Sequence, residues 1–284
     1  MFFIEDWYEE LRQQLILIKE NDWSIPKDVD LDALITDMLR FIGHTDGELR
    51  DGLIYLTFCE LTEGDTLTEA RIRHILFTCL DDNHLFHGIG EDETDTVFAR
   101  SFSALGISVA LYTQYERPFL SAKELADIKD RILNYITLEK DFRGYVEGKG
   151  WAHSIAHIAD VLAHMVCFDN IDGDETIGRD AMLAILDAVK LMACNAVVAY
   201  DSGEDERMAV VFVDACDSEV LTQEELTGWL DSVNTAEPPE KPAGNRFHTN
   251  RRNLLRSIYF QLLENGDHEE ICKHLLGFFV KSDE

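Results

Sequence analysis

Residues 139–164 read EKDFRGYVEGKGWAHSIAHIADVLAH, a glycine-rich half followed by a half whose apolar residues have helical spacing. At about 100° per residue, Ile155, Ile158 and Leu162 fall on one side of the helix that this spacing predicts over residues 151–167. That side is the expected core-facing side, because an amphipathic helix buries its apolar stripe. The stretch therefore predicts an α-helix, and the same spacing continues outward along the chain in both directions.

Helical spacing of apolar residues is found along nearly the whole sequence, which contains only five prolines. Residues that favour helix starts precede several of these segments, among them Asp30 and Thr222, and Glu225 follows Thr222 at the spacing of a capping box. The predicted helices cover residues 5–20, 30–42, 48–62, 67–80, 94–115, 121–138, 151–167, 175–200, 205–217, 222–232, 250–264 and 267–281. The sequence thus indicates an all-α fold.

A degenerate repeat adds detail to this prediction. Acidic residues, an arginine and an apolar helix follow one another in GELRDGLIYLTFCEL (47–61), DTVFARSFSALGISVAL (95–111), KDFRGYV (140–146) and GEDERMAVVFVDAC (203–216), and NRRNLLRSIYFQLL (250–263) supplies the arginine without the acid. Units of this kind lie roughly 40–65 residues apart, which favours a HEAT-like or armadillo-like α-solenoid of degenerate helix pairs. A closed helical bundle is the alternative. The arginines of these units, Arg50, Arg100 and Arg207, are expected first of all to order helix pairs.

Length and composition favour a single all-helical domain over residues 1–284. Hydrophobic residues make up 46% of the chain, enough for a folded core. The connection 233–249 contains three of the five prolines and is expected to form a loop before the last helix pair. The roughly 35 residues that follow it are too few to bury a core of their own.

The chain is strongly acidic, with 55 Asp and Glu against 25 Lys and Arg and a formal net charge of −30. Such a surface repels the phosphates of nucleic acids and of anionic membranes, so neither is an expected partner. A protein or peptide with a basic patch is the better electrostatic match, and acidity that serves only solubility is the simpler alternative. The sequence leaves the oligomeric state open.

The cysteines and the hydropathy pattern indicate the compartment. Six cysteines are widely separated and none forms a CxxC pair, which favours reduced thiols over a disulfide framework. No window of 18 uncharged apolar residues is present, and the acidic start MFFIEDWYEE is unlike a signal peptide. We therefore expect a cytoplasmic protein.

Three histidines and an aspartate are expected to share one face of the 151–167 helix. His153, His157, Asp160 and His164 fall within about 60° of one another, opposite the apolar side. The spacing of His153, His157 and Asp160 is able to present two imidazoles and a carboxylate to a divalent metal, although no HExxH motif is present. The alternative is a polar seam, in which these side chains bond to carbonyls or acids of neighbouring helices.

Gly144, Gly148 and Gly150 precede this helix and invite comparison with a phosphate-binding loop. The segment GYVEGKG has one residue too few between its glycines, and a glycine stands where such loops have Ser or Thr. Tight turning of the chain under Trp151 is therefore the expected role of these glycines.

Two segments, FARSFSALGISVAL (98–111) and DFRGYVEGKGWAHSIAHIADVL (141–162), resemble the bacterial family called domain of unknown function 2785, and the resemblance extends over nearly the full chain. It implies a soluble, all-helical protein from bacteria of the Gram-positive type. It implies no reaction, cofactor or partner. The positions that match the family signature are Arg100, Arg143, Gly144, Gly150, Trp151, His153, His157 and Asp160.

Three functions are consistent with these features. The favoured one is a scaffold that binds a protein or peptide along a groove. The expected groove residues are Arg100, Asp141, Arg143, Trp151, His153, His157, Asp160 and His164. The alternative is a metal-dependent enzyme, in which His153, His157 and Asp160 bind the metal or transfer protons and Arg143 holds an anionic substrate. A nucleic-acid mimic that occupies a basic site on a DNA-binding protein is the third. No cofactor other than this divalent metal is expected, and the sequence leaves open whether the protein is an enzyme.

Overall fold

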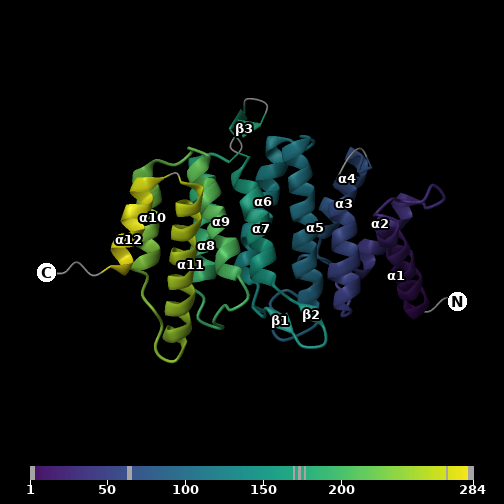
Figure 1. The fold of residues 1–284 in the computed structure, drawn as a ribbon, viewed down its shortest axis with the longest axis horizontal. Helices are drawn as coiled ribbons and strands as arrows, with labels where there is room; N and C mark the ends of the chain where they lie inside the picture. Colours follow the sequence, from purple (N-terminus) through teal and green to yellow (C-terminus); the bar gives the residue numbers. More distant parts are fainter. Residues whose placement is uncertain are drawn as a thin grey trace. The chain divides into compact units, whose positions relative to one another are not determined.

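A computed structural model describes residues 4–62, 66–168, 170–171, 174–175, 177–266 and 268–280 of the chain. In these residues the fold is all-α, with two short hairpins (Figure 1). The elements in chain order are α1 (Ile4–Glu20), α2 (Leu31–Phe41), η1 (Glu48–Tyr55), α3 (Leu56–Thr62), α4 (Glu69–Cys79), α5 (Thr96–Glu116), α6 (Ala122–Leu138), β1 (Tyr145–Val146), β2 (Gly150–Trp151), α7 (Ser154–Val166), β3 (Asn170–Ile171), β4 (Asp174–Glu175), α8 (Arg179–Ala193), α9 (Glu204–Asp217), α10 (Gln223–Asn234), α11 (Ala243–Asn265) and α12 (Glu269–Phe279).

The all-α prediction is confirmed, and helices occupy nearly every segment in which helical spacing was found. The expected start signals work through hydrogen bonds. The side chain of Asp30 accepts from the backbone N–H groups of Asp32 and Ala33 at the start of α2. Thr222 and Glu225 form a reciprocal capping box at the start of α10. Both arrangements satisfy N–H groups that have no partner inside the helix.

The proline-rich connection is shorter than expected. α10 ends at Asn234 and α11 begins at Ala243, so the loop covers residues 235–242 instead of 233–249. Pro242 directly precedes α11, where its restricted φ suits a helix start. The residues after it, which the sequence pattern assigned to the loop, form the first turns of α11.

The helix predicted over residues 48–62 consists of two segments of different winding. η1 is a π-helix from Glu48 to Tyr55, and α3 continues from Leu56 with α-helical bonding. A π-helix widens the backbone by one residue per turn and changes the direction in which its side chains project. In this segment the change places Leu49, Arg50, Leu53 and Ile54 in the interior.

The chain divides into two compact units. Unit 1 comprises the described residues of Met1–Phe119 and Leu138–His157, and unit 2 comprises those of Leu120–Thr137 and Ile158–Glu284. That the whole chain behaves as a single domain stays a prediction.

The core of unit 1 is built around α5. Nearly all residues of this helix from Val97 to Leu111 are buried, and it packs against η1, α3 and α4. A helix that is apolar on all sides is stable only when other elements surround it. Gly106 permits the closest approach to α4, because a Cβ atom at this position would lie 2.5 Å from Cys79 Sγ.

The core of unit 2 is formed mainly by α9 and α11, which pack along each other. α8 packs against α9, while α10 and α12 pack against α11. Asn250, which is fully buried on α11, fastens the connection between α8 and α9. It accepts from the backbone N–H of Tyr200 at 2.9 Å, and its amide donates to the carbonyls of Asn195 and Val198 at 3.0 and 2.9 Å.

None of the helices in the described ranges is long and apolar enough to cross a membrane. The six cysteines are free thiols, and Cys79 and Cys216 are buried in the two cores.

Candidate functional site

A small hairpin stands directly before α7. β1 and β2 pair in antiparallel register, with Tyr145 opposite Trp151 and Val146 opposite Gly150. Gly148 and Gly150 have φ angles of +75° and +83°, in the left-handed region that residues with a side chain rarely adopt. The expected role of these two glycines in tight turning is therefore confirmed.

Arg50 of η1 fixes this hairpin from inside unit 1. Its guanidinium is fully buried and donates through Nη2 to the carbonyls of Lys149 and Trp151 at 2.8 and 3.0 Å. Nη1 donates to the carbonyl of His44. The same guanidinium lies over the rings of Phe98 and Phe102, with its Cζ 4.1 and 4.6 Å from the ring centroids.

The charge of Arg50 is stabilised without an ion pair among the described residues. Burial lowers the pKa of Arg50 to about 10, and nearby Asp51, Asp46 and Asp95 oppose this shift. At neutral pH the side chain therefore stays protonated, and its charge is balanced by carbonyl dipoles and aromatic faces. The arginine that the repeat pattern marked as structural is the main internal support of the hairpin.

Gly47 brings the hairpin and η1 together. A Cβ atom at this position would lie 2.8 Å from the carbonyl oxygen of Lys149 and 3.3 Å from Cα of Gly150. The backbones of the hairpin and of the residue before η1 thus pack closely, next to the hydrogen bonds donated by Arg50. The hairpin is held both by close backbone packing and by charge-assisted hydrogen bonds.

Above this support lies a row of rings that we call the ledge, made by Tyr145, Trp151 and His153. Tyr145 is 61% exposed, and its ring meets that of Trp151 edge to face with centroids 5.0 Å apart. Trp151 stacks on His153 at 4.3 Å and 16°. The ledge continues inward, because His153 meets His157 edge to face at 5.5 Å, and His157 meets Phe102 at 5.1 Å.

His153 belongs to the ledge because it lies just outside the helix. α7 begins at Ser154, and the φ angle of His153 is +52°. The helical projection that placed His153 and His157 on one stripe therefore does not apply to His153. Asp51 of η1 lies close enough for electrostatic attraction to His153, while burial raises the pKa of Asp51.

His157 is only 7% exposed and faces α5. Its Nδ1 lies 2.7 Å from Ser101 Oγ and 3.3 Å from the Ser101 carbonyl oxygen. The Ser101 hydroxyl donates to the carbonyl of Ala152, so Nδ1 must supply the proton in its bonds to Ser101. This assigns the tautomer with a proton on Nδ1. Ser101 is fully buried and donates its proton to a carbonyl, so the Ser–His pair fastens α5 to α7 and is not arranged as an exposed nucleophile with its base.

The two arginines of the family signature are engaged in hydrogen bonds that join separate segments of unit 1. Arg100 and Glu139 form a fully buried bidentate pair, with Nε–Oε2 at 2.6 Å and Nη2–Oε1 at 2.8 Å. Arg143 pairs with buried Asp141 through Nε at 2.8 Å and donates to the carbonyl of Thr94 at 2.6 Å. The hydrogen bond to Asp141 raises the pKa of Arg143. Both guanidinium groups tie the segment before the hairpin to the segment before α5.

The four residues predicted to share one helix face, His153, His157, Asp160 and His164, have different contacts. Asp160 forms an ion pair with Arg207 of α9 within unit 2. His164 is mostly buried, and this burial lowers its pKa. Over the ranges that the structure covers, no three His, Cys, Asp or Glu side chains are placed to share a metal ion. The charge of Asp160 is balanced by the guanidinium of Arg207, and metal binding by these residues stays a prediction.

Acidic residues border the ledge. The run EDETD at residues 91–95 precedes α5, and Asp92, Glu93 and Asp95 in it are exposed. Lys149 of the hairpin pairs with Asp95, with its Nζ 2.6 Å from Oδ1, and Arg143 is attracted to both Asp95 and Glu93. The hairpin turn adds exposed Glu147. The ledge is thus an aromatic surface next to a strongly acidic one.

Sequence reasoning found the hairpin segment but missed its surroundings. Tyr145, Ser101 and the acidic run were not expected to lie together. The bonds that assemble the site join residues far apart in the chain, such as Arg50 to Trp151 across 101 positions. The sequence spacing around Arg50 contains no signal for such a partner.

A family model described as "Protein of unknown function (DUF2785)" matches residues 85–260 of the chain. The match covers the acidic run, α5, the hairpin and the whole of α7. No curated protein and no solved structure matches the chain.

Proposed function

The chain belongs to the DUF2785 family, and we propose that it is a scaffold that binds a basic segment of a partner protein on the ledge. The observation on which the proposal rests is a row of aromatic rings, with Tyr145 exposed and Trp151 and His153 partly buried, that is held by Arg50 and bordered by acids. Tyr145 and Trp151 offer faces and edges for the side chains of arginine or lysine. The neighbouring carboxylates supply the complementary charge.

The acids beside the ledge are available for such a partner. Asp92, Glu93 and Glu147 are exposed and form no ion pair among the described residues. The formal charge of −30 adds a long-range attraction that speeds the encounter with a basic segment. Because exposed charges are screened by salt, binding should weaken as ionic strength rises.

Preorganisation supports the proposal further. Arg50 holds the carbonyl of Trp151, and Ser101 holds that of Ala152, so the backbone beneath the ledge is fixed before a partner arrives. A rigid aromatic anchor loses little conformational entropy on binding. The proposal therefore explains why an arginine without an ion pair in the described chain is buried below a surface hairpin.

As part of the same proposal, the helices form a HEAT-like array. Packing between neighbours in sequence supports it, since α1 packs on α2 and α4 on α5 in unit 1, and α8 packs on α9 in unit 2. Small-angle scattering separates this proposal from a closed bundle, because an elongated array has a larger radius of gyration than a sphere of the same mass. The free thiols agree with a reducing, cytoplasmic location.

The test uses peptides of defined sequence. An array of 12-residue peptides that contain arginine or lysine at varied spacing is screened against the purified chain, and the best binder is measured by fluorescence anisotropy. The aromatic variants are Tyr145→Ala and Trp151→Ala. The matched control is Tyr115→Ala on α5, because Tyr115 is also 61% exposed and lies in unit 1. We expect the ledge variants to weaken binding about tenfold or more and the control to leave it within twofold.

Charge-reversal variants separate local from global attraction. Glu93→Lys combined with Glu147→Lys changes the net charge by the same amount as Glu10→Lys combined with Glu20→Lys, whose glutamates are exposed on α1. The first pair should weaken binding much more than the second. Equal loss in both pairs, or equal loss for Tyr145 and Tyr115, would show that the acidic chain attracts basic peptides without a defined site.

A further inference from the structure

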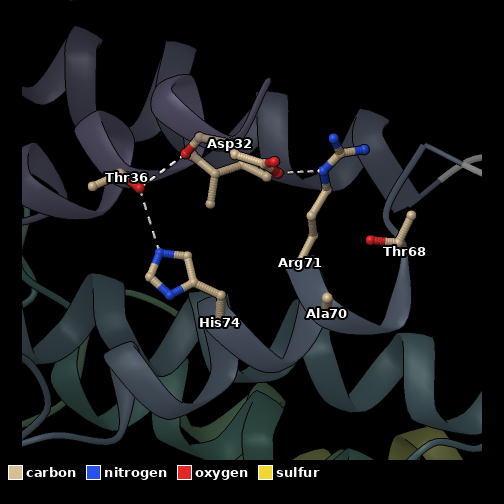
Figure 2. Close-up of a pocket in the computed structure, with 7 residues that line it drawn as sticks. Asp32, Thr36, Thr68, Ala70, Arg71 and His74 are labelled. Atoms are coloured by element: carbon tan, nitrogen blue, oxygen red, sulfur yellow. Dashed lines mark hydrogen bonds and ion pairs between the residues drawn. The ribbon is translucent and has the colours of Figure 1, made fainter. Parts of the chain in front are cut away.

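Two arginines on the exposed face of α11 in unit 2 have no partner in the described part of the chain. Elsewhere arginines are engaged, as Figure 2 shows at the pocket between α2 and α4, where Arg71 Nε donates to Asp32 Oδ1 at 2.6 Å. Arg252 and Arg256 are exposed and form no hydrogen bond, ion pair or ring contact with any residue that the structure describes. Such a pair is unusual in this chain, because its Asp and Glu residues outnumber Lys and Arg by 55 to 25.

The other two arginines of α11 bond to loops of unit 2. Arg246 Nε donates to the carbonyl of Ala196 at 2.9 Å, and Arg251 Nη1 donates to the carbonyl of Ala236 at 3.2 Å. The helix contains a single acidic residue, Glu264, close to its C-terminal end. A local excess of positive charge therefore lies on one helix of an otherwise acidic chain.

Aromatic and aliphatic side chains continue the same face toward the C-terminal end of α11. Phe260 is 62% exposed and Leu263 is 54% exposed. The partly buried ring of Tyr259 meets that of Phe260 edge to face, with centroids 5.4 Å apart. At about 100° per residue, these three side chains and the two unpaired arginines fall within about 100° of one another. We call this face the α11 stripe, made by Arg252, Arg256, Tyr259, Phe260 and Leu263.

We propose that the α11 stripe binds an acidic amphipathic helix of a partner protein. Two carboxylates one turn apart on the partner pair with Arg252 and Arg256, because a guanidinium binds a carboxylate through two parallel N–H donors. Apolar side chains one to two turns further along the partner cover Phe260 and Leu263. The spacing is the same on both helices, because both have the same rise per residue. The α11 stripe shares no residue with the ledge, and its charge selects the opposite kind of segment.

Charge and size favour a short helix over other anionic partners. From its first to its last residue the α11 stripe is about 16 Å long, or three helical turns. Nucleic acids and anionic membranes present phosphates over a much wider area, which the net charge of −30 repels. A second copy of the chain has the same net charge and is repelled as well. A single acidic helix meets the two arginines without bringing a wide anionic surface close to the rest of the chain.

The probe is a helix-forming peptide of about 15 residues with two glutamates four positions apart and leucines four and seven positions after the second glutamate. A second peptide has the reverse order, since helices pack in either direction. The control peptides contain glutamine in place of both glutamates. Binding to the full-length protein is measured by fluorescence anisotropy at low salt. We expect one of the two acidic peptides to bind with a Kd of about 0.1 mM or below, and its glutamine form to bind at least about tenfold more weakly.

Variants locate the binding on α11. The double variant Arg252→Glu/Arg256→Glu should abolish binding. Its matched control is Lys123→Glu/Lys273→Glu, which changes the net charge by the same amount at side chains of unit 2 that are 81% and 58% exposed. The control should keep binding within about threefold, because distant exposed charges are screened by salt.

A second pair of variants tests the apolar part of the α11 stripe. Leu263→Ala should weaken binding about fivefold. Leu191→Ala on α8, at a leucine that is 53% exposed, should leave binding within twofold. All substituted side chains are exposed, and circular dichroism verifies that each variant keeps its helix content.

The proposal is overturned if neither acidic peptide binds at 1 mM, if the glutamine forms bind equally well, or if control and stripe variants lose binding equally. Phosphatidylserine vesicles and light scattering of the protein alone test the other occupants. Vesicle binding or self-association that Arg252→Glu/Arg256→Glu removes, without peptide binding, would assign the α11 stripe to a membrane or to a second copy and would likewise overturn the proposal.

Discussion

Replacing Arg50 by methionine removes the cation that joins the hairpin to η1, and the cost of this change can be worked out from its bonds. Methionine fills a similar volume with an apolar chain. The carbonyls of His44, Lys149 and Trp151 lose their shared donor. A buried acceptor without a partner costs about 1–3 kcal/mol, so the gross loss is roughly 3–9 kcal/mol.

Two effects reduce this loss. The variant no longer has to bury a guanidinium, and the effective cost of doing so is several kcal/mol. Methionine also retains favourable contacts with the rings of Phe98 and Phe102 through its sulfur. We therefore expect Arg50→Met to lower the free energy of unfolding of unit 1 by about 3 kcal/mol. Arg50→Lys keeps the charge but loses the planar fork that reaches three carbonyls, so it should cost about 2 kcal/mol.

The assay is urea unfolding followed by tryptophan fluorescence in a Trp229→Phe background. Trp229 belongs to unit 2, whereas Trp7, Trp23 and Trp151 belong to unit 1, so the remaining signal reports on the unit that contains Arg50. Amide exchange of Ala152, which donates to the carbonyl of Gly144 at 2.8 Å, reports on the hairpin itself.

The control is Arg40→Met, since Arg40 has a side chain that is 46% exposed and an exposed ion pair. It should change stability by no more than about 0.5 kcal/mol. A cost below about 1 kcal/mol for Arg50→Met, with unchanged exchange at Ala152, would show that the guanidinium does not support the hairpin.

Two further predictions concern packing and charge. Gly106→Ala should destabilise the chain by about 1–3 kcal/mol in urea unfolding, because the new Cβ would lie 2.5 Å from Cys79 Sγ. Gly228 on α10 faces open space, so Gly228→Ala should stabilise the chain by about 0.5–1 kcal/mol. Equal effects of the two variants would refute this contrast in packing. Burial and the neighbouring Asp217 raise the pKa of Asp214 to about 6. The folded state therefore loses stability as pH rises from about 4 through 6, because ionisation of Asp214 is less favourable in the folded than in the unfolded chain. Asp214→Asn should flatten the pH dependence of the thermal midpoint in that window. An unchanged pH profile in this variant would contradict that assignment.

The helices could be predicted because their signals are local. The capping box of Thr222 and Glu225 involves neighbours in the chain, and the apolar spacing of α5 repeats within a few residues. The π-helical winding of η1 could not be predicted in this way. Arg50 in this segment bonds to carbonyls that lie about 100 positions away, and the local spacing does not indicate these partners.

That residues 139–164 form a functional site stays a prediction, and the helical projection behind it does not hold for His153. Projection of His153 and His157 onto one helix assumed that the helix includes both residues, and a single φ angle of +52° at His153 removes that assumption. The positive φ arises where the hairpin bends into α7, so it is a tertiary feature. His153 consequently stacks on Trp151 in the ledge and His157 is buried against Ser101, while the two imidazole rings still meet edge to face at 5.5 Å.

The charged residues of the family signature, which suggest chemistry most strongly, all form ion pairs with other side chains of the chain. Arg100 is paired with Glu139, Arg143 with Asp141, and Asp160 with Arg207. Each of these charges is thus already paired within the chain. What they hold in place is a backbone that presents Trp151 next to an exposed Tyr145. The proposed peptide binding needs an aromatic surface of this kind, so the alanine variants of the ledge are the decisive test of that proposal.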